Sequence, residues 1–118
     1  MNKIAVITGA SRGIGLALAK KMLNSGYIVI GSSRDGNIDT INQDNFYPMA
    51  LNLKEEKSIK EFANAVSERF KEIYILINNA GVSMRALFND LNLDVIRNPM
   101  DVNFWGTVYC SKYAMPHL

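Results

Sequence analysis

Four short apolar runs are the most regular feature of this 118-residue chain. Each run is rich in β-branched residues and ends at glycine or polar residues, a pattern typical of strands that are buried on both faces. The runs occupy residues 3–8, 27–30, 47–51 and 73–77. Pro48 in the third run has no N–H to donate, so we expect that strand to start there or to lie at a sheet edge.

Between these runs, apolar residues recur at helical spacing. Residues 14–23 carry a broad apolar face, and Gly26 stands where glycine commonly follows the C-terminus of a helix. After the second strand, residues 32–36 are expected to form a polar exit loop.

A second helix is predicted from Ser58 onward. Ser58 and Glu61 form a capping-box pattern, in which both side chains accept free N–H groups at a helix start. The apolar stripe of this helix consists of Ile59, Phe62, Ala63, Val66 and Phe70. Residues 93–118 have a mostly helical pattern, which Pro99 interrupts because it lacks a backbone donor and crowds the preceding turn.

The alternation of strands and helices predicts the fold class. Successive strands joined by helices form a parallel sheet that is covered on both faces and has right-handed crossovers. The chain has no internal repeat, low-complexity tract or linker. We therefore expect one α/β domain over residues 1–118, with about four strands and flanking helices.

Composition and charge exclude several functional classes. The chain is 48% apolar, and its 13 basic and 11 acidic residues are too balanced for an electrostatic nucleic-acid or membrane binder. One cysteine, Cys110, and one histidine, His117, exclude an internal disulfide and argue against a metal site. No apolar run approaches the roughly 20 residues that span a bilayer. Residues 1–10 do not resemble a signal peptide, so we expect a cytoplasmic protein.

A glycine-rich turn between the first strand and the first helix carries the strongest chemical signal. Gly9, Gly13 and Gly15 let the backbone turn tightly and come close to a ligand. The turn opens a helix, whose free N–H groups and positive dipole end favour an anion such as a phosphate. The spacing differs from G-x-G-x-x-G and lacks the Gly-Lys-Ser/Thr of a Walker A loop.

Three motifs together resemble those of the short-chain dehydrogenase/reductase family. Residues 8–15 (TGASRGIG) match its Thr-Gly-x-x-x-Gly-x-Gly cofactor motif, and residues 78–81 (NNAG) match its second signature. Residues 100–103 (MDVN), followed by Gly106, match the third. The resemblance covers essentially the whole chain. It implies a Rossmann-type doubly wound parallel sheet, incomplete here, that binds a nicotinamide dinucleotide at the carboxyl ends of its strands.

The resemblance also implies roles for individual residues. The residues expected at the cofactor pyrophosphate or facing the cofactor are Gly9, Ser11, Arg12, Gly13, Ile14 and Gly15. Those expected beside the adenosine ribose are Asn79, Ala80 and Gly81. Asn52 and Leu53 end the third strand, where the family usually has Asp in place of Asn52. An Asn carbonyl still accepts from the adenine amino group, but without charge.

Residues after the second strand predict which nicotinamide cofactor binds. An acidic residue there accepts from the free 2′-hydroxyl of NAD, whereas an arginine accommodates the 2′-phosphate of NADP. Ser33 occupies the position where NAD-preferring relatives have Asp, and Arg34 follows it. Arg12 adds a second cation, whereas Asp35 is a counter-signal that could reach a ribose hydroxyl. We expect NADP in preference to NAD; the alternative is that both arginines are ordinary solvated charges.

The residues with which the family transfers a proton are missing from this sequence. Relatives use a Ser, a Tyr and a Lys four residues after the Tyr, which lowers the pKa of the Tyr hydroxyl. None of the eight lysines has a Tyr four positions earlier. We interpret Tyr109 and Lys112, three apart, as a surface or packing pair. Asn103 is the one member of the catalytic group present; its role there is to support a water, and as a buried polar group it needs partners.

Two main interpretations stay open. In the first, the chain is a truncated NADP-dependent oxidoreductase that keeps its cofactor-binding elements and stops before the Ser and Tyr-x-x-x-Lys segment. Its full-length form would interconvert a small carbonyl and an alcohol. In the second, it is a non-catalytic dinucleotide-binding fragment or one half of a split enzyme. A third interpretation is a remnant that does not fold stably, because the fourth strand leaves an apolar edge open.

The last predicted helix carries three aromatic residues, Phe104, Trp105 and Tyr109. We expect them to pack against the sheet or a partner subunit, because aromatic residues dominate cores and interfaces. The family often dimerises through this helix, which makes a homo-oligomer a further expectation. Residues 84–88 follow the second signature, where relatives have variable substrate-side residues, so they indicate little about the substrate.

Overall fold

A parallel four-stranded sheet forms the centre of the computed structural model, which describes residues 3–82 and 93–118. The strands are β1 (Ile4–Ile7), β2 (Ile28–Ser33), β3 (Phe46–Ala50) and β4 (Ile75–Ile77). Their order across the sheet is β3-β2-β1-β4, and all neighbouring pairs are parallel. The predicted fold class is therefore confirmed. Residues 84–88 lie outside the described residues.

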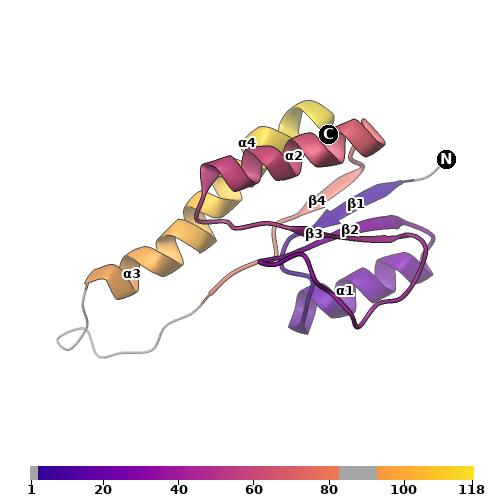
Figure 1. Ribbon diagram of the computed structural model, residues 1–118, viewed down its shortest axis with the longest axis horizontal. Coiled ribbons are helices and arrows are strands. Elements are labelled where there is room, and N and C mark those ends of the chain that lie inside the picture. The colour runs from indigo at the N-terminus through magenta and orange to yellow at the C-terminus, as the bar shows by residue number, and fades with distance from the viewer. Residues whose placement is uncertain (1–2, 83–92) are drawn as a thin grey trace.

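Helices cover both faces of the sheet (Figure 1). Helix α1 (Gly13–Asn24) lies on one face, and helices α2 (Glu56–Phe70) and α4 (Gly106–Ala114) lie on the other. Helix α3 (Leu93–Pro99) extends beyond the sheet and leads through a π-helical segment, η2 (Met100–Trp105), into α4. A short 3₁₀ turn, η3 (Met115–His117), follows α4. Gly26, with a positive φ of 90°, follows the C-cap of α1, as expected.

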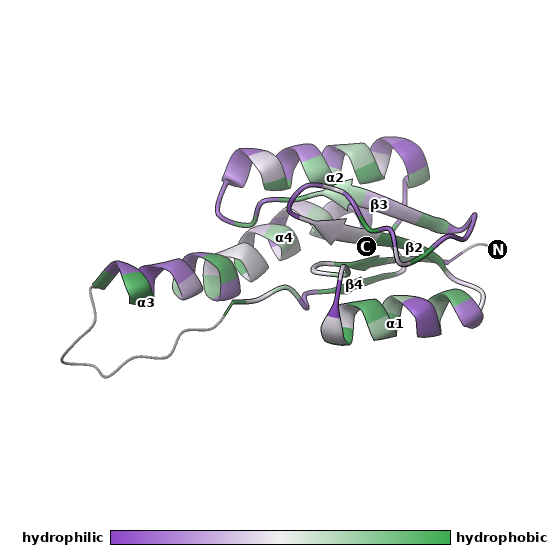
Figure 2. Cartoon of the chain, turned by 60° about the horizontal axis from the view of Figure 1, so that its bottom comes forward, coloured by the Kyte–Doolittle hydropathy of each residue, from purple (hydrophilic) through white to green (hydrophobic). Residues whose placement is uncertain are grey.

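Side chains alternate across the sheet and build a core on each face. In β1, Ile4 and Val6 belong to the apolar cluster under α2 and α4, whereas Ala5 and Ile7 belong to the cluster under α1. All four are buried, which explains why the strand is a continuous apolar run. The helices are striped with polar and apolar residues around their axes (Figure 2). The sheet is thus covered by helices on both faces.

The predicted cap of α2 is wrong. The helix begins at Glu56, and its N-cap residue, Glu55, makes no side-chain capping hydrogen bond. The Ser58 hydroxyl oxygen instead accepts a hydrogen bond from the backbone N–H of Asn52, at 2.9 Å. Ser58 therefore ties the helix to the end of β3, and this contact outweighs the local capping pattern.

Strand β2 runs further than predicted. Ser32 and Ser33 belong to the strand rather than to a polar exit loop. Ser32 is buried, and its hydroxyl oxygen accepts a hydrogen bond from the N–H of Gly9 at 3.1 Å. A polar residue can continue this buried strand because its hydrogen bond is satisfied by the neighbouring turn.

Strand β4 is shorter than predicted. It begins at Ile75, and the preceding N–H of Ile73 donates to the carbonyl oxygen of His117, whereas that of Tyr74 donates to the carbonyl oxygen of Ile4 in β1. The strand is at the edge of the described sheet, as is β3, where Pro48 lies as expected.

The aromatic residues of the C-terminal helices differ in exposure. Phe104 and Trp105 contact each other edge to face, with ring centroids 5.2 Å apart, and are 50% and 46% exposed. Only Tyr109 packs against the core under α2 and α4. Packing against the sheet is therefore wrong for Phe104 and Trp105, which η2 turns outward, whereas packing against a partner subunit stays a prediction for both. This segment directly follows Pro99, where α3 ends as expected.

Candidate functional site

A cleft opens at the carboxyl ends of the four strands. Its volume is about 830 Å³, which is within the range of cofactor sites. In open parallel sheets, ligands bind at this edge, where the strand order reverses, here between β1 and β4. The lining comes from the loops after all four strands and from α3 and η2.

Most of the predicted cofactor residues meet in this cleft. Those that line it are Gly9, Ser11, Arg12, Gly13, Arg34, Asn52, Leu53, Asn79, Ala80 and Gly81. Ile14 and Gly15 do not line it. The Ile14 side chain is 78% exposed on α1, and Gly15 is buried behind the glycine-rich turn.

Thr8 and Asn79 hold the turn after β1 against the turn after β4. The buried hydroxyl of Thr8 accepts hydrogen bonds from the N–H groups of Asn79 and Ala80, both at 3.1 Å. The Asn79 side-chain amide donates to the carbonyl oxygen of Gly9 at 3.0 Å. The two motifs that flank the cleft are therefore one hydrogen-bonded unit, although about 70 residues separate them.

The packing behind this unit leaves no room for a side chain at Gly15. A Cβ added there would lie 2.0 Å from the carbonyl oxygen of Gly9 and 2.5 Å from the side-chain nitrogen of Asn79. At Gly13, by contrast, a Cβ would meet no atom within 4 Å. Gly15 supports the turn from behind, whereas Gly13 faces the open cleft.

The N-terminus of α1 points into the cleft without a side-chain cap. Arg12 is the N-cap residue in extended conformation, and no side-chain hydrogen bond caps the helix among the described residues. The first N–H groups of a helix need acceptors, and the helix dipole favours an anion at this end. The turn is chemically suited to a phosphate group.

The end of β2 forms a closed hydrogen-bonded loop. The Ser33 hydroxyl donates to Asp35 Oδ1 at 3.2 Å and accepts from the N–H of Gly36 at 3.0 Å. Asp35 Oδ1 also accepts from the N–H of Asn37 at 2.9 Å. These bonds to the ionised carboxylate, first the one from Asn37, lower the pKa of Asp35. The carboxylate is therefore directed into its own loop.

Among the residues that the structure describes, three cations line the cleft: Arg12, Arg34 and Lys54. All three are exposed, and no ion pair within residues 3–82 and 93–118 involves them. Asp35 is the only acidic residue among the described residues that line the cleft. The rim is therefore positively charged, and Lys54 belongs to it although sequence reasoning did not single it out.

The side chain of Asn52, two residues after the end of β3, makes two hydrogen bonds within its loop. Its Oδ1 accepts from the N–H of Lys54 at 3.1 Å, and its Nδ2 donates to Glu55 Oε1 at 3.1 Å. A carbonyl oxygen has two lone pairs, so Oδ1 keeps one for a ligand. Leu53 packs against Gly106 at the start of α4, which fixes this loop to the C-terminal helices.

Asn103 is exposed, so its predicted burial is wrong. Its side chain bonds both ways to the backbone of Val82: Oδ1 accepts from the N–H at 2.8 Å, and Nδ2 donates to the carbonyl at 2.7 Å. This pair of bonds lies on the surface where the loop after β4 meets η2. Asn103 does not line the cleft, whereas Val82 does.

Asn98 is a lining residue that the sequence did not reveal. Its side-chain oxygen is buried and is the only buried side-chain polar atom without a hydrogen-bond partner in the part of the chain that the structure describes. Buried polar atoms are rarely left unpaired. No local pattern around residue 98 could have indicated this.

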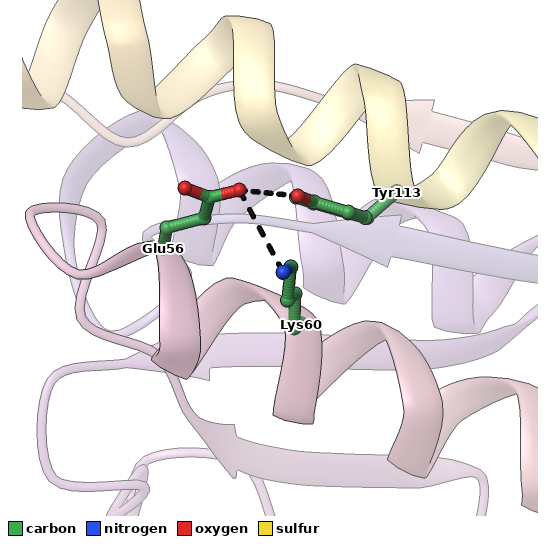
Figure 3. A network of polar contacts seen from close by, with 3 residues as sticks. All are labelled: Glu56, Lys60 and Tyr113. Atoms are coloured by element: carbon green, nitrogen blue, oxygen red, sulfur yellow. Dashed lines mark hydrogen bonds and ion pairs between the residues drawn. The ribbon is translucent and has the colours of Figure 1, made fainter.

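Tyr109 and Lys112 lie away from the cleft. The Lys112 ammonium is 5.6 Å from the ring centroid of Tyr113, and Tyr109 is partly buried against the core under α2 and α4. The Tyr113 hydroxyl donates to Glu56, which also pairs with Lys60 at 3.9 Å (Figure 3). The hydrogen bond to the carboxylate raises the pKa of Tyr113 to about 12. This network joins α4 to α2.

Other site classes find little support within the described residues. Burial raises the pKa of the Cys110 thiol to about 11, the opposite of what a nucleophilic cysteine needs. No group of three or more His, Cys, Asp or Glu residues with the arrangement of a metal site occurs in residues 3–82 and 93–118. In the same residues no helix has the length and apolarity to cross a membrane.

Comparison with known proteins shows which family this chain belongs to. Residues 3–118 match the family model described as short chain dehydrogenase. The chain belongs to the short-chain dehydrogenase family. An uncharacterised oxidoreductase of Schizosaccharomyces pombe is 36% identical over 110 residues, which is 93% of this chain and 38% of that protein.

Solved structures share the fold of this chain. The structure of ElxO with NADP bound has a TM-score of 0.89 at 28% identity, covering 99% of this chain and 50% of that one. A 3-ketoacyl-(acyl-carrier-protein) reductase from Brucella melitensis, complexed with NADH, has a TM-score of 0.90 at 25% identity, covering 98% of this chain and 50% of that one. The chain therefore spans half or less of the length of these relatives.

Proposed function

We propose that this chain is the cofactor-binding portion of an NADP-dependent oxidoreductase. The observation that carries the proposal is the charge around the end of β2. Arg12 and Arg34 line the cleft as exposed cations that form no ion pair with any residue the structure describes, whereas the carboxylate of Asp35 is hydrogen-bonded within its own loop. A 2′-phosphate is a dianion that such a pair of arginines can bind from two sides.

The residues of the cleft fit a dinucleotide. The N-terminus of α1, which has no side-chain cap, offers the N–H groups of its first turn to the pyrophosphate, and Gly9, Ser11 and Gly13 line the cleft beside it. The volume of about 830 Å³ is ample for such a ligand. ElxO binds NADP and the Brucella reductase binds NADH on the same fold. The fold accepts either cofactor, so the preference must come from residues such as Arg34.

The adenosine end of the cofactor is assigned to the loops after β3 and β4. Asn52 has a free lone pair for the adenine amino group, and Leu53 lines the same end of the cleft. Asn79, Ala80 and Gly81 lie beside the glycine-rich turn, where the ribose would pass. In this proposal the chain binds and orients the cofactor, and Thr8 and Asn79 keep the two turns at a fixed separation.

A nicotinamide cofactor held in this cleft would supply a hydride to a carbonyl carbon or accept one from an alcohol carbon. The carbonyl oxygen must also gain a proton, which the family takes from a Tyr activated by Lys. The nearest sequence candidates, Tyr109 and Lys112, lie outside the cleft. We therefore propose that the 118-residue chain binds the cofactor but does not turn over. Asn103 then has only a supporting role through its bonds to Val82.

The open edge of β4 favours a second candidate function for the same chain. Ile75, Leu76 and Ile77 are only partly buried at the edge of the described sheet, which suits addition of another strand. The chain would then be a dinucleotide-binding half that works with a separately encoded half. Reading the coding sequence beyond codon 118 distinguishes the two. A frame that continues into a Ser and a Tyr-x-x-x-Lys supports the first function, and an undamaged stop codon supports the second.

Two assays test the main proposal. Arg34→Ala and Arg12→Ala should each weaken NADPH binding about tenfold or more, because each removes a charge-assisted contact. Lys20→Ala, which removes an exposed cation on α1 away from the cleft, is the matched control and should have little effect. A carbonyl reductase assay should show no turnover. NADPH binding that is insensitive to both arginines, or robust turnover that Asn103→Ala abolishes, would contradict the proposal.

A further inference from the structure

We propose that Asp35 is a positioning residue for cofactor preference: it holds the loop after β2 so that Arg34 faces the 2′-phosphate of NADP. This inference rests on the proposed function. It assigns to Asp35, an acidic residue on the cleft rim, a role opposite to the usual one, in which an acid after the second strand repels the phosphate and selects NAD.

The hydrogen bonds around Asp35 support this role. Its Oδ1 receives two donors, the Ser33 hydroxyl at 3.2 Å and the N–H of Asn37 at 2.9 Å. The same Ser33 hydroxyl accepts from the N–H of Gly36 at 3.0 Å. Arg34 is therefore the second residue of a turn whose first, third, fourth and fifth residues are bonded to one another. Such side-chain bonds to a local backbone replace the regular hydrogen bonds that a loop lacks.

Both ends of this turn are anchored to the fold. The carbonyl of Ser33 accepts from the N–H of Leu51 at 2.8 Å, which fixes the start of the loop to β3. Ile38 is buried in the core under α1 and fixes the end. Gly36 has a φ of 81°, and a Cβ there would lie 3.0 Å from the backbone nitrogen of Ala50. The backbone on either side of Arg34 is thus fixed to the rest of the fold. The hydrogen bonds of Asp35 restrict the conformation of the turn between these two anchors.

Charge and positioning predict opposite effects at residue 35. A carboxylate close to a phosphate raises the electrostatic energy of binding, so charge alone predicts that removing Asp35 strengthens NADP binding. Positioning predicts that removing its acceptor weakens NADP binding, because Arg34 loses its fixed direction and must be ordered when the phosphate binds. Asp35→Asn and Asp35→Ala separate the two effects. Both remove the charge, but only Asn keeps an oxygen with two lone pairs for Ser33 and Asn37.

The experiment is a titration of NADPH and NADH into the 118-residue wild type, Asp35→Asn, Asp35→Ala, Arg34→Ala and the Arg34→Ala/Asp35→Ala double variant. We expect Asp35→Asn to bind NADPH at least as tightly as the wild type. We expect Asp35→Ala to bind NADPH about tenfold more weakly than Asp35→Asn. A tenfold loss in affinity is close to the contribution of one charge-assisted hydrogen bond, here the bond between Arg34 and the 2′-phosphate. NADH lacks the phosphate, so its affinity should differ less than about twofold between these two variants.

The double variant shows whether Asp35 acts through Arg34. If it does, Asp35→Ala has no further effect on NADPH binding once Arg34 is absent. Equal NADPH affinities of Asp35→Asn and Asp35→Ala, or equal losses for NADPH and NADH, would overturn the inference. If Asp35→Ala loses its fold by circular dichroism, Ser33→Ala, which removes the hydroxyl that bonds Asp35 and Gly36, takes its place with the same expectation.

The Arg34→Ala variant separates this inference from the proposed function. If Arg34→Ala leaves the NADPH to NADH preference unchanged, the proposed NADP function fails, and the role of Asp35 fails with it. If Arg34→Ala abolishes the preference but Asp35→Ala behaves like Asp35→Asn, only the positioning role of Asp35 is wrong.

Discussion

The side-chain amide of Asn79 donates a hydrogen bond of 3.0 Å to the backbone carbonyl of Gly9. This bond joins the loop after β4 to the glycine-rich turn after β1, and the Thr8 hydroxyl reinforces it from the other side. The floor of the cleft is therefore built from two segments that are distant in the sequence. Its shape depends on a few polar contacts that can be removed one at a time.

Asn79→Ala should destabilise the fold and weaken dinucleotide binding. The substitution removes the donor to Gly9 and leaves a part-buried carbonyl without its partner, which costs about 1–2 kcal/mol. Asn78→Ala is the matched control, because Asn78 is exposed and its side-chain amide donates to the Ser111 hydroxyl at 3.3 Å in a solvent-exposed bond. Its effect should be within about 0.5 kcal/mol. Urea unfolding measures both, and equal losses for the two variants would contradict the role given to Asn79.

Gly15→Ala should be far more harmful than Gly13→Ala. A Cβ at Gly15 would lie 2.0 Å from the Gly9 carbonyl oxygen, so the turn must move, at a cost of about 3 kcal/mol or more. Gly13 has open space around it but a φ of 60°, so an added Cβ costs about 1–2 kcal/mol through backbone strain alone. Chemical unfolding of both variants tests the order. A Gly15→Ala variant as stable as Gly13→Ala would show that the turn is not packed as described.

The contact between Tyr113 and Glu56 should give a stability difference that depends on pH. The pKa of Tyr113 is raised to about 12 in the fold from an ordinary value of 10.0, so the folded state favours the protonated hydroxyl. The contribution is fully present below pH 10 and is lost as the pH rises towards 12. We expect wild type to be more stable than Tyr113→Phe at neutral pH, and this difference to shrink across that range. A difference that does not change with pH would mean that the hydrogen bond does not contribute.

The sequence predicted the elements whose residues carry a local signal. The continuous apolar run of β1 predicts a buried strand, and the three glycines after it predict a turn. Both are found where expected. Gly26 and Pro99 also mark the helix ends that the structure shows. Ten of the twelve predicted cofactor residues line one cleft, because the motifs stand at the carboxyl ends of parallel strands.

The remaining features depend on contacts between distant residues. Ser58 resembles a helix cap but bonds to the N–H of Asn52, and Ser32 resembles a loop residue but continues β2 because Gly9 bonds to it. Asn103 faces solvent and bonds to the backbone of Val82 rather than being buried. In each case a tertiary partner decides the outcome, and a local pattern does not record that partner.

The cofactor preference is the central claim, and a side-by-side titration tests it most directly. The dissociation constants of NADPH and NADH are measured by calorimetry on the 118-residue chain, in one buffer at one salt concentration. If Arg12 and Arg34 bind the 2′-phosphate, NADPH should bind at least about tenfold more tightly than NADH. NADH that binds as tightly as NADPH, or more tightly, would contradict this account.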